Sequence, residues 1–315
     1  MRGSVEARGL IAGAAVCAVL MAACGGAPGA RSPRPAQDPA PAETESAAAG
    51  PAAGEARRIV SLVPAVTEML FAIGAGPRVV AVGSFDTFPP EVLSLPKVGA
   101  LIDPDLERII TLKPDLVVIH SGQVDLAEKL RRVGIRTFPY ALAGLDNVTA
   151  TIDRLGAIVG SRQEARRLAD TITARLDAIR RRVAGLPRPA TLLVFSREPG
   201  TLRSVYASGG VGFLHDLVEL AGGRDVFAYV KRESLQATTE AILAAAPEVI
   251  IELRYGSSVD PKRLDAERDS WNVLSAVPAV RNHRVHLLVG DELVVPGPRV
   301  AATAERFAAV LHPRR

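Results

Sequence analysis

One pattern of residues occurs twice in this chain, about 130 positions apart, and it restricts the possible fold more than any other feature. The first copy runs Glu107-Arg-Ile-Ile-Thr-Leu-Lys-Pro114-Asp-Leu-Val-Val, and the second runs Glu240-Ala-Ile-Leu-Ala-Ala-Ala-Pro247-Glu-Val-Ile-Ile. Because the residue before a proline disfavours the helical conformation, each copy predicts a helix that ends at the proline and leads into a buried strand. A supersecondary unit that recurs in this way predicts two similar lobes.

Short β-branched runs alternate with helical stretches on both sides of the two copies. Runs typical of strands cover residues 58–62, 78–82, 116–119, 135–139 and 191–195, and a last helical stretch lies around 300–311. Alternation of this kind predicts parallel sheets with helices on their faces. We therefore expect an α/β fold of two Rossmann-like lobes, at residues 57–145 and 186–315.

Residues 146–185 interrupt the alternation with two long helical patterns, the second of which begins at a capping box formed by Ser161 and Glu164. A helix of about 24 residues at 1.5 Å per residue spans about 35 Å, which is long enough to join two lobes. We expect a linker helix in this segment and a ligand cleft between the lobes that it joins.

The N-terminal segment has the features of an export signal. Arg2 and Arg8 precede an apolar stretch at 10–23 that is too short to span a membrane comfortably, and Cys24 follows it. Residues 1–24 predict a lipoprotein signal peptide with Cys24 as the acylated residue; the alternative is a plain signal peptide cut near Ala23. Residues 25–56 are rich in Ala and Pro and predict a disordered tether.

Several classes of protein are excluded by composition and by the absence of motifs. The net charge of +4 comes from 38 basic and 34 acidic residues spread along the chain, so we expect no nucleic-acid partner. Both cysteines lie in the first 24 residues, which excludes a cysteine nucleophile or a cysteine-ligated metal in the body. The chain has no Gly-x-Ser-x-Gly elbow and no His-Glu-x-x-His helix, so we expect no enzyme activity and no cofactor.

Four groups of residues outside the repeat admit a functional or a structural interpretation. Gly209-Gly-Val-Gly212 precedes a helix and could bind an anion through backbone N–H groups, or form a plain loop. His283 and His286 are metal-ligand candidates, but their spacing within a strand would point them to opposite faces. His120 follows a buried strand directly, at the edge where α/β sheets bind ligands, and would hydrogen-bond a ligand, coordinate its metal or be an ordinary solvated histidine. Phe85 and Phe88 would form an apolar wall of the cleft or pack within their loop.

Four segments together resemble one family. Arg58-Ile-Val-Ser-Leu-Val-Pro-Ala-Val-Thr-Glu68, Leu106-Glu-Arg-Ile109, Lys113-Pro-Asp-Leu-Val117 and Pro296-Gly-Pro-Arg299 look like the cobalamin-binding branch of the ABC-importer substrate-binding proteins. This helix-linked class also includes ferric-siderophore and haem binders, and the resemblance covers residues 57–311. It implies a monomeric, exported protein, anchored to a membrane by its lipid in the periplasm or at the cell surface. Such a protein captures a cobalamin, or alternatively a ferric siderophore or haem, and delivers it to an ABC permease and its ATPase.

The resemblance also implies roles for particular residues. Glu107 and Glu240 match the surface acids, one per lobe, that dock with arginines of the permease; the alternative is that each favours the dipole at a helix start. The cleft positions of the family correspond here to Phe85, Leu101, His120, Asp291 and Arg299. The family's cobalamin binders line the cleft with Trp and Tyr, whereas Leu101 and His120 stand at two of those positions and the single Trp271 lies elsewhere. Cobalamin is the leading candidate, and a chelatase-like enzyme or sensor on the same fold is a less favoured alternative.

Overall fold

The computed structural model describes residues 54–256 and 260–313. The predicted signal peptide, the lipidation site Cys24 and nearly all of the predicted tether lie outside the described residues. Ala56, at the end of the predicted tether, is buried, and its N–H group donates to the carbonyl of Ile158.

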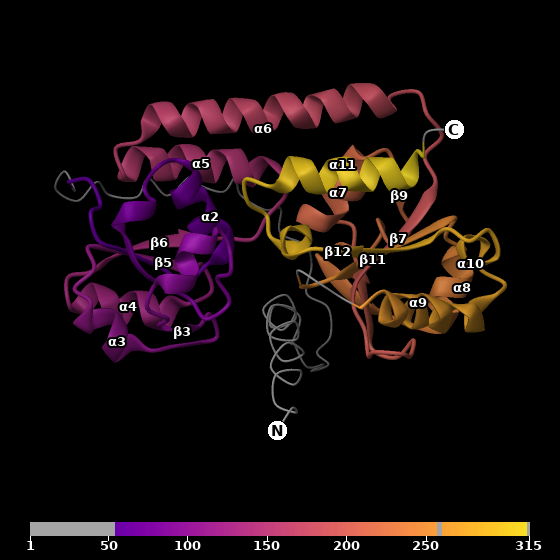
Figure 1. Cartoon of the computed structure of the whole chain (residues 1–315), viewed down its shortest axis with the longest axis horizontal. Helices are drawn as coiled ribbons and strands as arrows, with labels where there is room; N and C mark the ends of the chain where they lie inside the picture. The colour runs from indigo at the N-terminus through magenta and orange to yellow at the C-terminus, as the bar shows by residue number, and fades with distance from the viewer. Residues whose placement is uncertain (1–53, 257–259, 314–315) are drawn as a thin grey trace, which may run out of the picture.

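Two α/β lobes lie side by side and are bridged by a long helix (Figure 1). This arrangement confirms the predicted fold of two lobes and a connecting helix. Three 3₁₀ segments flank the cleft or the core. They are η3 (Pro90–Ser94), η4 (Ser270–Leu274) and η5 (Asp291–Val294).

The N-terminal lobe is built on a four-stranded sheet with the order β2-β1-β5-β6, in which every neighbouring pair is parallel. Its strands are β1 (Ile59–Ser61), β2 (Val79–Val82), β5 (Leu116–His120) and β6 (Arg136–Tyr140). Its helices are α2 (Pro64–Ala72), α3 (Leu106–Thr111) and α4 (Val124–Arg132), and a small antiparallel pair joins β3 (Gly99–Ala100) to β4 (Asp103–Pro104). The parallel sheet predicted for this lobe is confirmed.

The C-terminal lobe has a mixed sheet with the order β10-β8-β7-β11-β12, and β9 pairs with β7. Its strands are β7 (Ala190–Ser196), β8 (Val205–Ser208), β9 (Arg224–Asp225), β10 (Ser234–Ala237), β11 (Val249–Arg254) and β12 (Val285–Val289). Its helices are α7 (Phe213–Leu220), α8 (Thr239–Ala245), α9 (Pro261–Asp269), α10 (Pro278–Arg281) and α11 (Val300–Leu311). The expectation of a parallel sheet is wrong for β8 and β10, which run antiparallel to their neighbours. The connection from β7 to β8 is too short for the crossover that a parallel pair requires.

The predicted linker segment holds two helices, α5 (Asp146–Ile158) and α6 (Arg162–Val183). The 22 residues of α6 correspond to about 33 Å, and α6 packs against α5 at the N-terminal lobe and against α11 at the C-terminal lobe (Figure 1). The predicted capping box is wrong, because the Ser161 side chain makes no capping hydrogen bond. A buried stripe along α6 supplies the packing instead: Ala165, Ala169, Ile172, Leu176, Ile179 and Val183.

The repeated pattern folds into the same unit in both lobes. In each copy the helix is followed by a residue with a left-handed backbone before the proline, Lys113 with φ 50° and Ala246 with φ 43°. The acidic residue after the proline then accepts a hydrogen bond from the start of a neighbouring strand. Asp115 Oδ2 accepts from Arg57 N at 2.8 Å, and Glu248 Oε2 accepts from Ala190 N at 2.7 Å. The spacing that the two copies share therefore sets both the end of the helix and its link to the adjacent strand.

Candidate functional site

A cavity lies where the carboxyl ends of all four strands of the N-terminal lobe meet the C-terminal lobe. Its lining comes from the residues after β1 and β2, the last residues of β5 and β6, and the segment before α11: Leu62, Val63, Pro64, Ala65, Gly83, Ser84, Phe85, Asp86, Leu101, Ile102, His120, Tyr140, Leu142, Val294, Val295 and Pro296. Most of these side chains are apolar. This is the place at which open α/β sheets bind ligands, and it fulfils the expectation of a cleft between the lobes.

The six predicted ligand-binding residues fall into two groups. Phe85, Leu101 and His120 line the cavity. Phe88, Asp291 and Arg299 lie beside it, where the two lobes touch one another.

His120 is the last residue of β5 and is paired in register with Tyr140 of β6. The Gly122 N–H group donates to its Nδ1 at 3.1 Å. Burial lowers the pKa of His120, so the ring is neutral at pH 7. Since Nδ1 accepts a hydrogen bond, the ring proton lies on Nε2. In this conformation His120 is a hydrogen-bond donor and has no lone pair free for a metal ion.

Gln123, a residue that no sequence pattern pointed to, holds the two cavity residues Leu101 and His120 in place. Its Oε1 accepts from His120 N at 2.8 Å, and its Nε2 donates to Leu101 O at 2.6 Å. One amide side chain thus joins the end of β5 to the loop after β3.

Arg299 forms a bidentate ion pair with Glu68 across the lobe junction. Its Nε lies 2.9 Å from Glu68 Oε2, and its Nη2 lies 2.6 Å from Glu68 Oε1. The guanidinium carbon also lies 4.1 Å from the centre of the Phe88 ring. Burial raises the pKa of Glu68, and the hydrogen bonds and charge of Arg299 partly offset that effect. Arg299, expected to contact the ligand, here clamps the two lobes together.

Asp291 makes a second polar contact between the lobes. Its Oδ1 accepts from Gly256 N at 2.9 Å within the C-terminal lobe, and Thr87 Oγ1 of the N-terminal lobe lies 3.4 Å from its Oδ2. Asp291 begins η5, the segment whose last residue, Val294, lines the cavity.

Sequence reasoning missed three further residues of the site: Glu68, Asp86 and Tyr140. Tyr140 ends a strand predicted at 135–139, so the rule that pointed to His120 applies to it as well. Asp86 lies in the loop after β2, beside Phe85, and is buried at the cavity wall. Glu68 lay within the family motif without an assigned role.

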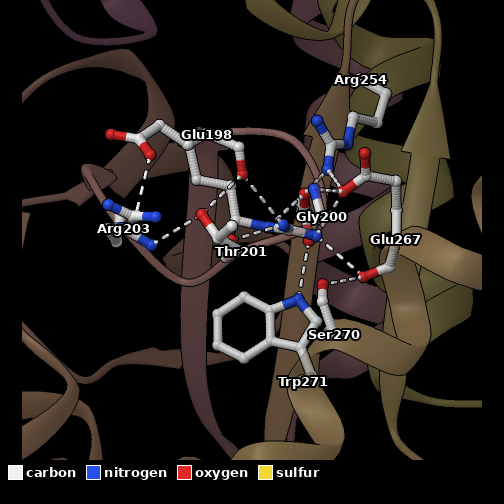
Figure 2. A network of polar contacts seen from close by, with 10 residues as sticks. Glu198, Gly200, Thr201, Arg203, Arg254, Glu267, Ser270 and Trp271 are labelled. Carbon is white, nitrogen blue, oxygen red and sulfur yellow. Dashed lines mark hydrogen bonds and ion pairs between the residues drawn. The ribbon is translucent and has the colours of Figure 1, made fainter.

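The single Trp271 lies away from the cleft, as expected from the sequence. It is buried in the C-terminal lobe, and its Nε1 donates to Glu252 Oε2 at 2.7 Å. Around it, Arg197 Nη2 and Arg254 Nη2 lie 2.9 and 2.7 Å from Glu267 Oε2 (Figure 2). Each buried charge in this network has an opposite charge beside it, which is what a stable interior requires.

Two N–H groups of the glycine-rich run before α7 are engaged with the protein's own backbone. Gly209 N donates to Glu233 O at 3.0 Å, and Gly210 N donates to Val230 O at 2.7 Å. A Cβ atom on Gly210 would lie 2.0 Å from the carbonyl oxygen of Ala228. These two glycines serve the close approach of two backbone segments, which favours the loop interpretation.

The two histidines considered as metal ligands, His283 and His286, lie at β12. His283 lies outside β12 with φ 53°, and His286 lies within it. Within residues 54–256 and 260–313, no three His, Cys, Asp or Glu side chains gather as a metal site would need. None of the helices described there is both long enough and apolar enough to cross a membrane.

Glu107 and Glu240 occupy matching places, each being the second residue of its helix, α3 or α8. Both are exposed. In each copy the residue three positions later is an exposed aliphatic side chain, Ile110 at 36% and Leu243 at 42% exposure. Figure 1 places α3 and α8 on different lobes, both on the side of the sheets away from α6. The molecule therefore presents two similar patches, each with one acid and one apolar side chain.

Comparison with known proteins gives consistent matches. The family model described as periplasmic binding protein matches residues 59–291. Among curated proteins, the chain is similar to YvrC of Bacillus subtilis (strain 168), an uncharacterized ABC transporter substrate-binding lipoprotein. The two are 29% identical over 267 residues, which are 82% of this chain and 81% of YvrC.

Two solved structures share the architecture. The periplasmic vitamin B12 binding protein BtuF of Vibrio cholerae matches with a TM-score of 0.70 and 25% identity, over 81% of this chain and 96% of that one. The periplasmic heme-binding protein RhuT from Roseiflexus sp. RS-1, in apo form, matches with a TM-score of 0.69 and 25% identity, over 81% of this chain and 98% of that one.

Proposed function

The chain belongs to the periplasmic binding protein family and is a substrate-binding protein of an ABC importer, and from this premise we propose that its ligand is a cobalamin or a related corrinoid. The observation that carries the proposal is the cavity between the lobes, whose walls are mostly apolar and carry few hydrogen-bonding side chains. Such a site suits a ligand with a large apolar surface and neutral polar substituents.

The leading alternative ligand is a haem or a ferric siderophore, since RhuT is a haem-binding protein with the same fold. A haem iron takes an axial ligand from the protein in many haem proteins, and a histidine would supply it through an unprotonated ring nitrogen. His120 is the histidine that lines the cavity, but its Nδ1 accepts the Gly122 N–H and its Nε2 carries the proton. Coordination would require this hydrogen bond to break, which favours cobalamin over haem.

The binding role requires no chemical turnover. The described residues of the cavity include one histidine and one carboxylic acid, His120 and Asp86, and these belong to different strand ends without a hydrogen bond between them. We propose that the protein is a carrier rather than a chelatase-like enzyme or a sensor, and that it works as a monomer.

We further propose that Glu107 and Glu240 dock with the permease, as the family resemblance implies. The matching positions of the two acids on α3 and α8 support this role. Two charged anchors on separate lobes fix the orientation of the protein on its partner, which a single ion pair cannot do. Ile110 and Leu243 would add apolar contact beside each acid.

Export and anchoring follow from the N-terminal residues. We propose that residues 1–24 are a lipoprotein signal peptide, that Cys24 is acylated and that residues 25–56 tether the lobes to the membrane. The similarity to YvrC, a substrate-binding lipoprotein, supports export. Metabolic labelling with a fatty acid tests this: label should enter the wild-type protein and be absent from Cys24→Ser.

The ligand is tested by calorimetric titration with cyanocobalamin, and with haem and a ferric hydroxamate in parallel. We expect saturable one-to-one binding of cobalamin with a dissociation constant below 1 μM, and no heat from the other two. Heat from haem or the hydroxamate alone would move the ligand and keep the transport role. No binding of any of the three would contradict the proposed ligand class.

The docking role is tested separately. Glu107→Arg and Glu240→Arg should abolish uptake of the ligand by cells while leaving the affinity of the purified protein for that ligand unchanged. Loss of affinity in either variant would show that the acids act on the cleft and not on the permease.

A further inference from the structure

The long helix α6 carries an excess of positive charge. It contains seven arginines and three acids, so its net charge of +4 equals the net charge of the whole chain. Two of the arginines have acidic partners, since Arg180 pairs with Asp177, and Arg175 pairs with Glu305 of α11. The other arginines of α6 are exposed and make no ion pair with another described residue: Arg162, Arg166, Arg167, Arg181 and Arg182. Only two acids of the helix are likewise exposed and without an ion pair among the described residues: Glu164 and Asp170.

The charged face of α6 points away from the rest of the protein. The buried stripe of the helix, from Ala165 to Val183, packs on α5 and α11, and Figure 1 shows α6 as the outermost helix on its side of the molecule. Arg167 and Arg181 lie about four turns apart, on the face opposite this stripe. None of the exposed large apolar side chains among the described residues belongs to α6. Because protein–protein interfaces have an apolar centre, this face suits a charged surface better than a protein partner.

The described chain begins beside the first turn of α6. The N–H group of Ala56 donates to the carbonyl of Ile158, the last residue of α5, at 3.0 Å. Arg78 Nη1 donates to the carbonyl of Ala56 at 3.1 Å. The helix α6 starts shortly after Ile158, at Arg162. Gly54, the first described residue, is therefore held at the same edge of the molecule as the start of α6.

This entry point decides which side of the molecule an N-terminal anchor brings to a membrane. Between Cys24, the proposed acylation site, and Gly54 lie 29 residues. A flexible chain of this length has an end-to-end distance of about 30 Å, which is similar to the length of α6. The anchor would therefore keep α6 within reach of the lipid headgroups, whereas α3 and α8 lie on the other side of the sheets (Figure 1).

We propose that the outer face of α6 binds the anionic lipid headgroups of the membrane that carries the anchor. Each arginine close to an anionic membrane surface strengthens binding by about fivefold. A protein bound in this way turns Glu107 and Glu240 away from the membrane, so it has to release α6 before it docks with a permease. This inference rests on the proposed function, because the proposed anchoring and docking define the two orientations.

The test is sedimentation of the protein with vesicles of phosphatidylcholine, either alone or with about 30% phosphatidylglycerol. The chain from Gly25 onwards is used, because it keeps every residue that the structure describes and lacks Cys24. No acyl group then contributes to binding. Each titration is made at about 0.1 M and about 1 M salt, where the screening length is about 10 Å and about 3 Å.

Two triple variants that lose the same charge are compared. The α6 variant removes three arginines that have no ion pair among the described residues: Arg167→Gln, Arg181→Gln and Arg182→Gln. The control variant removes three cations from α4 and α9, which lie on the side of the sheets away from α6 (Figure 1): Lys129→Gln, Arg131→Gln and Lys262→Gln. All six side chains are exposed, and circular dichroism verifies that both variants are folded.

We expect the wild type to bind the phosphatidylglycerol vesicles at low salt and to leave them at high salt. The α6 variant should bind about a hundredfold more weakly, because it lacks three arginines. The control variant should bind almost as the wild type does, because its charges lie farther than a screening length from the membrane. Equal binding of the wild type to both kinds of vesicle, or an equal loss in the two triple variants, would overturn the proposal. Retention on an immobilised polyanion without binding to vesicles would assign the arginines to a different partner and overturn it as well.

A second measurement determines the orientation of the acylated protein on vesicles. Ala174 of α6 and Ala244 of α8 are exposed, and both cysteines of the chain lie within its first 24 residues, so Ala174→Cys or Ala244→Cys adds a single site for a fluorescent probe. On phosphatidylglycerol vesicles that contain an energy acceptor, the probe on α6 should transfer more energy than the probe on α8. Equal transfer, or more transfer from α8, would contradict the proposed orientation.

The outcomes distinguish this proposal from the proposed function. If sedimentation gives the expected result but Cys24 takes up no fatty acid, the lipid-binding face of α6 stands and the proposed anchor is wrong. If Cys24 is acylated but the α6 variant binds vesicles as tightly as the wild type, this proposal is wrong and the proposed anchoring stands. Cobalamin takes no part in either measurement, so the identity of the ligand does not affect the result.

Discussion

Removing Arg299 should destabilise the protein in a strongly pH-dependent way. The Arg299 guanidinium holds Glu68 through two short contacts, at 2.6 and 2.9 Å, and lies over the Phe88 ring. In Arg299→Ala the Glu68 carboxylate stays buried but loses its opposite charge. A buried ion pair that loses one partner costs about 3 kcal/mol or more, because the remaining charge is desolvated without compensation. The lost contact with Phe88 adds about 0.5–1 kcal/mol.

The pH dependence follows from the pKa of Glu68. Burial already raises this pKa in the wild-type protein, and Arg299 limits the rise. Without Arg299 the folded-state pKa rises further above the unfolded value, so the folded protein keeps a proton that the unfolded chain releases as the pH rises. Stability is then lost with increasing pH. We expect a penalty of about 3 kcal/mol or more at pH 8 that becomes smaller towards pH 5, because protonation of Glu68 removes the uncompensated charge while the loss of the Phe88 contact, about 0.5–1 kcal/mol, remains.

The assay is unfolding by urea at both pH values, followed by far-ultraviolet circular dichroism. Fluorescence of Trp271 alone would report on the C-terminal lobe, in which that side chain is buried. Arg175→Ala is the matched control, since Arg175 pairs with Glu305 at 3.0 Å between two exposed side chains. It should cost less than about 1 kcal/mol at either pH. A penalty for Arg299→Ala that is equal at pH 5 and pH 8, or as small as that of the control, would refute the reasoning.

Three further predictions concern other parts of the molecule. Asp86→Asn should become more stable than the wild type as the pH rises from 4 to 8. The folded wild-type acid keeps its proton up to about pH 7 while the unfolded one releases it near 3.8, so the wild type loses about 4 kcal/mol of unfolding free energy that the variant keeps. Urea unfolding would detect this difference, which should vanish at pH 4. Ile110→Ser and Leu243→Ser should weaken ligand uptake by cells without changing ligand affinity, and normal uptake in both would remove the apolar residues from the docking surface. Asp115→Ala and Glu248→Ala should each cost about 1 kcal/mol or more in unfolding experiments, because Asp115 accepts from the N–H groups of Arg57 and Arg58 and Glu248 accepts from that of Ala190; no measurable cost in either variant would argue against this role.

The sequence was sufficient to predict the two lobes because their signals are local. The helix–proline–strand unit depends on residues within twelve positions of one another, and both copies fold as predicted, with Lys113 and Ala246 in the same left-handed conformation. The antiparallel strands β8 and β10 were missed because their direction depends on the length of the connection from β7 and on pairing between distant residues. Periodicity in the sequence carries no information on strand direction.

The site was predictable only where one strand end decided it. His120 was found because it directly follows a buried run, and the same rule would have found Tyr140 had it been applied to each strand. The pairing of Glu68 with Arg299 joins residues 231 positions apart, and no local pattern relates them. The burial of Asp86 at the cavity wall likewise depends on how the loop after β2 packs, which only the folded structure specifies.

The contacts between the lobes limit how a ligand can enter. A cavity of about 100 Å³ cannot enclose a chelate, so the ligand must either separate the lobes or lie across their mouth. Separation at the junction would break the Glu68–Arg299 ion pair. The helix α6 also packs against α5 and α11, and so opposes the same movement. A small opening at the mouth that leaves the Glu68–Arg299 pair intact is therefore favoured, with the ligand lying across the mouth of the cavity.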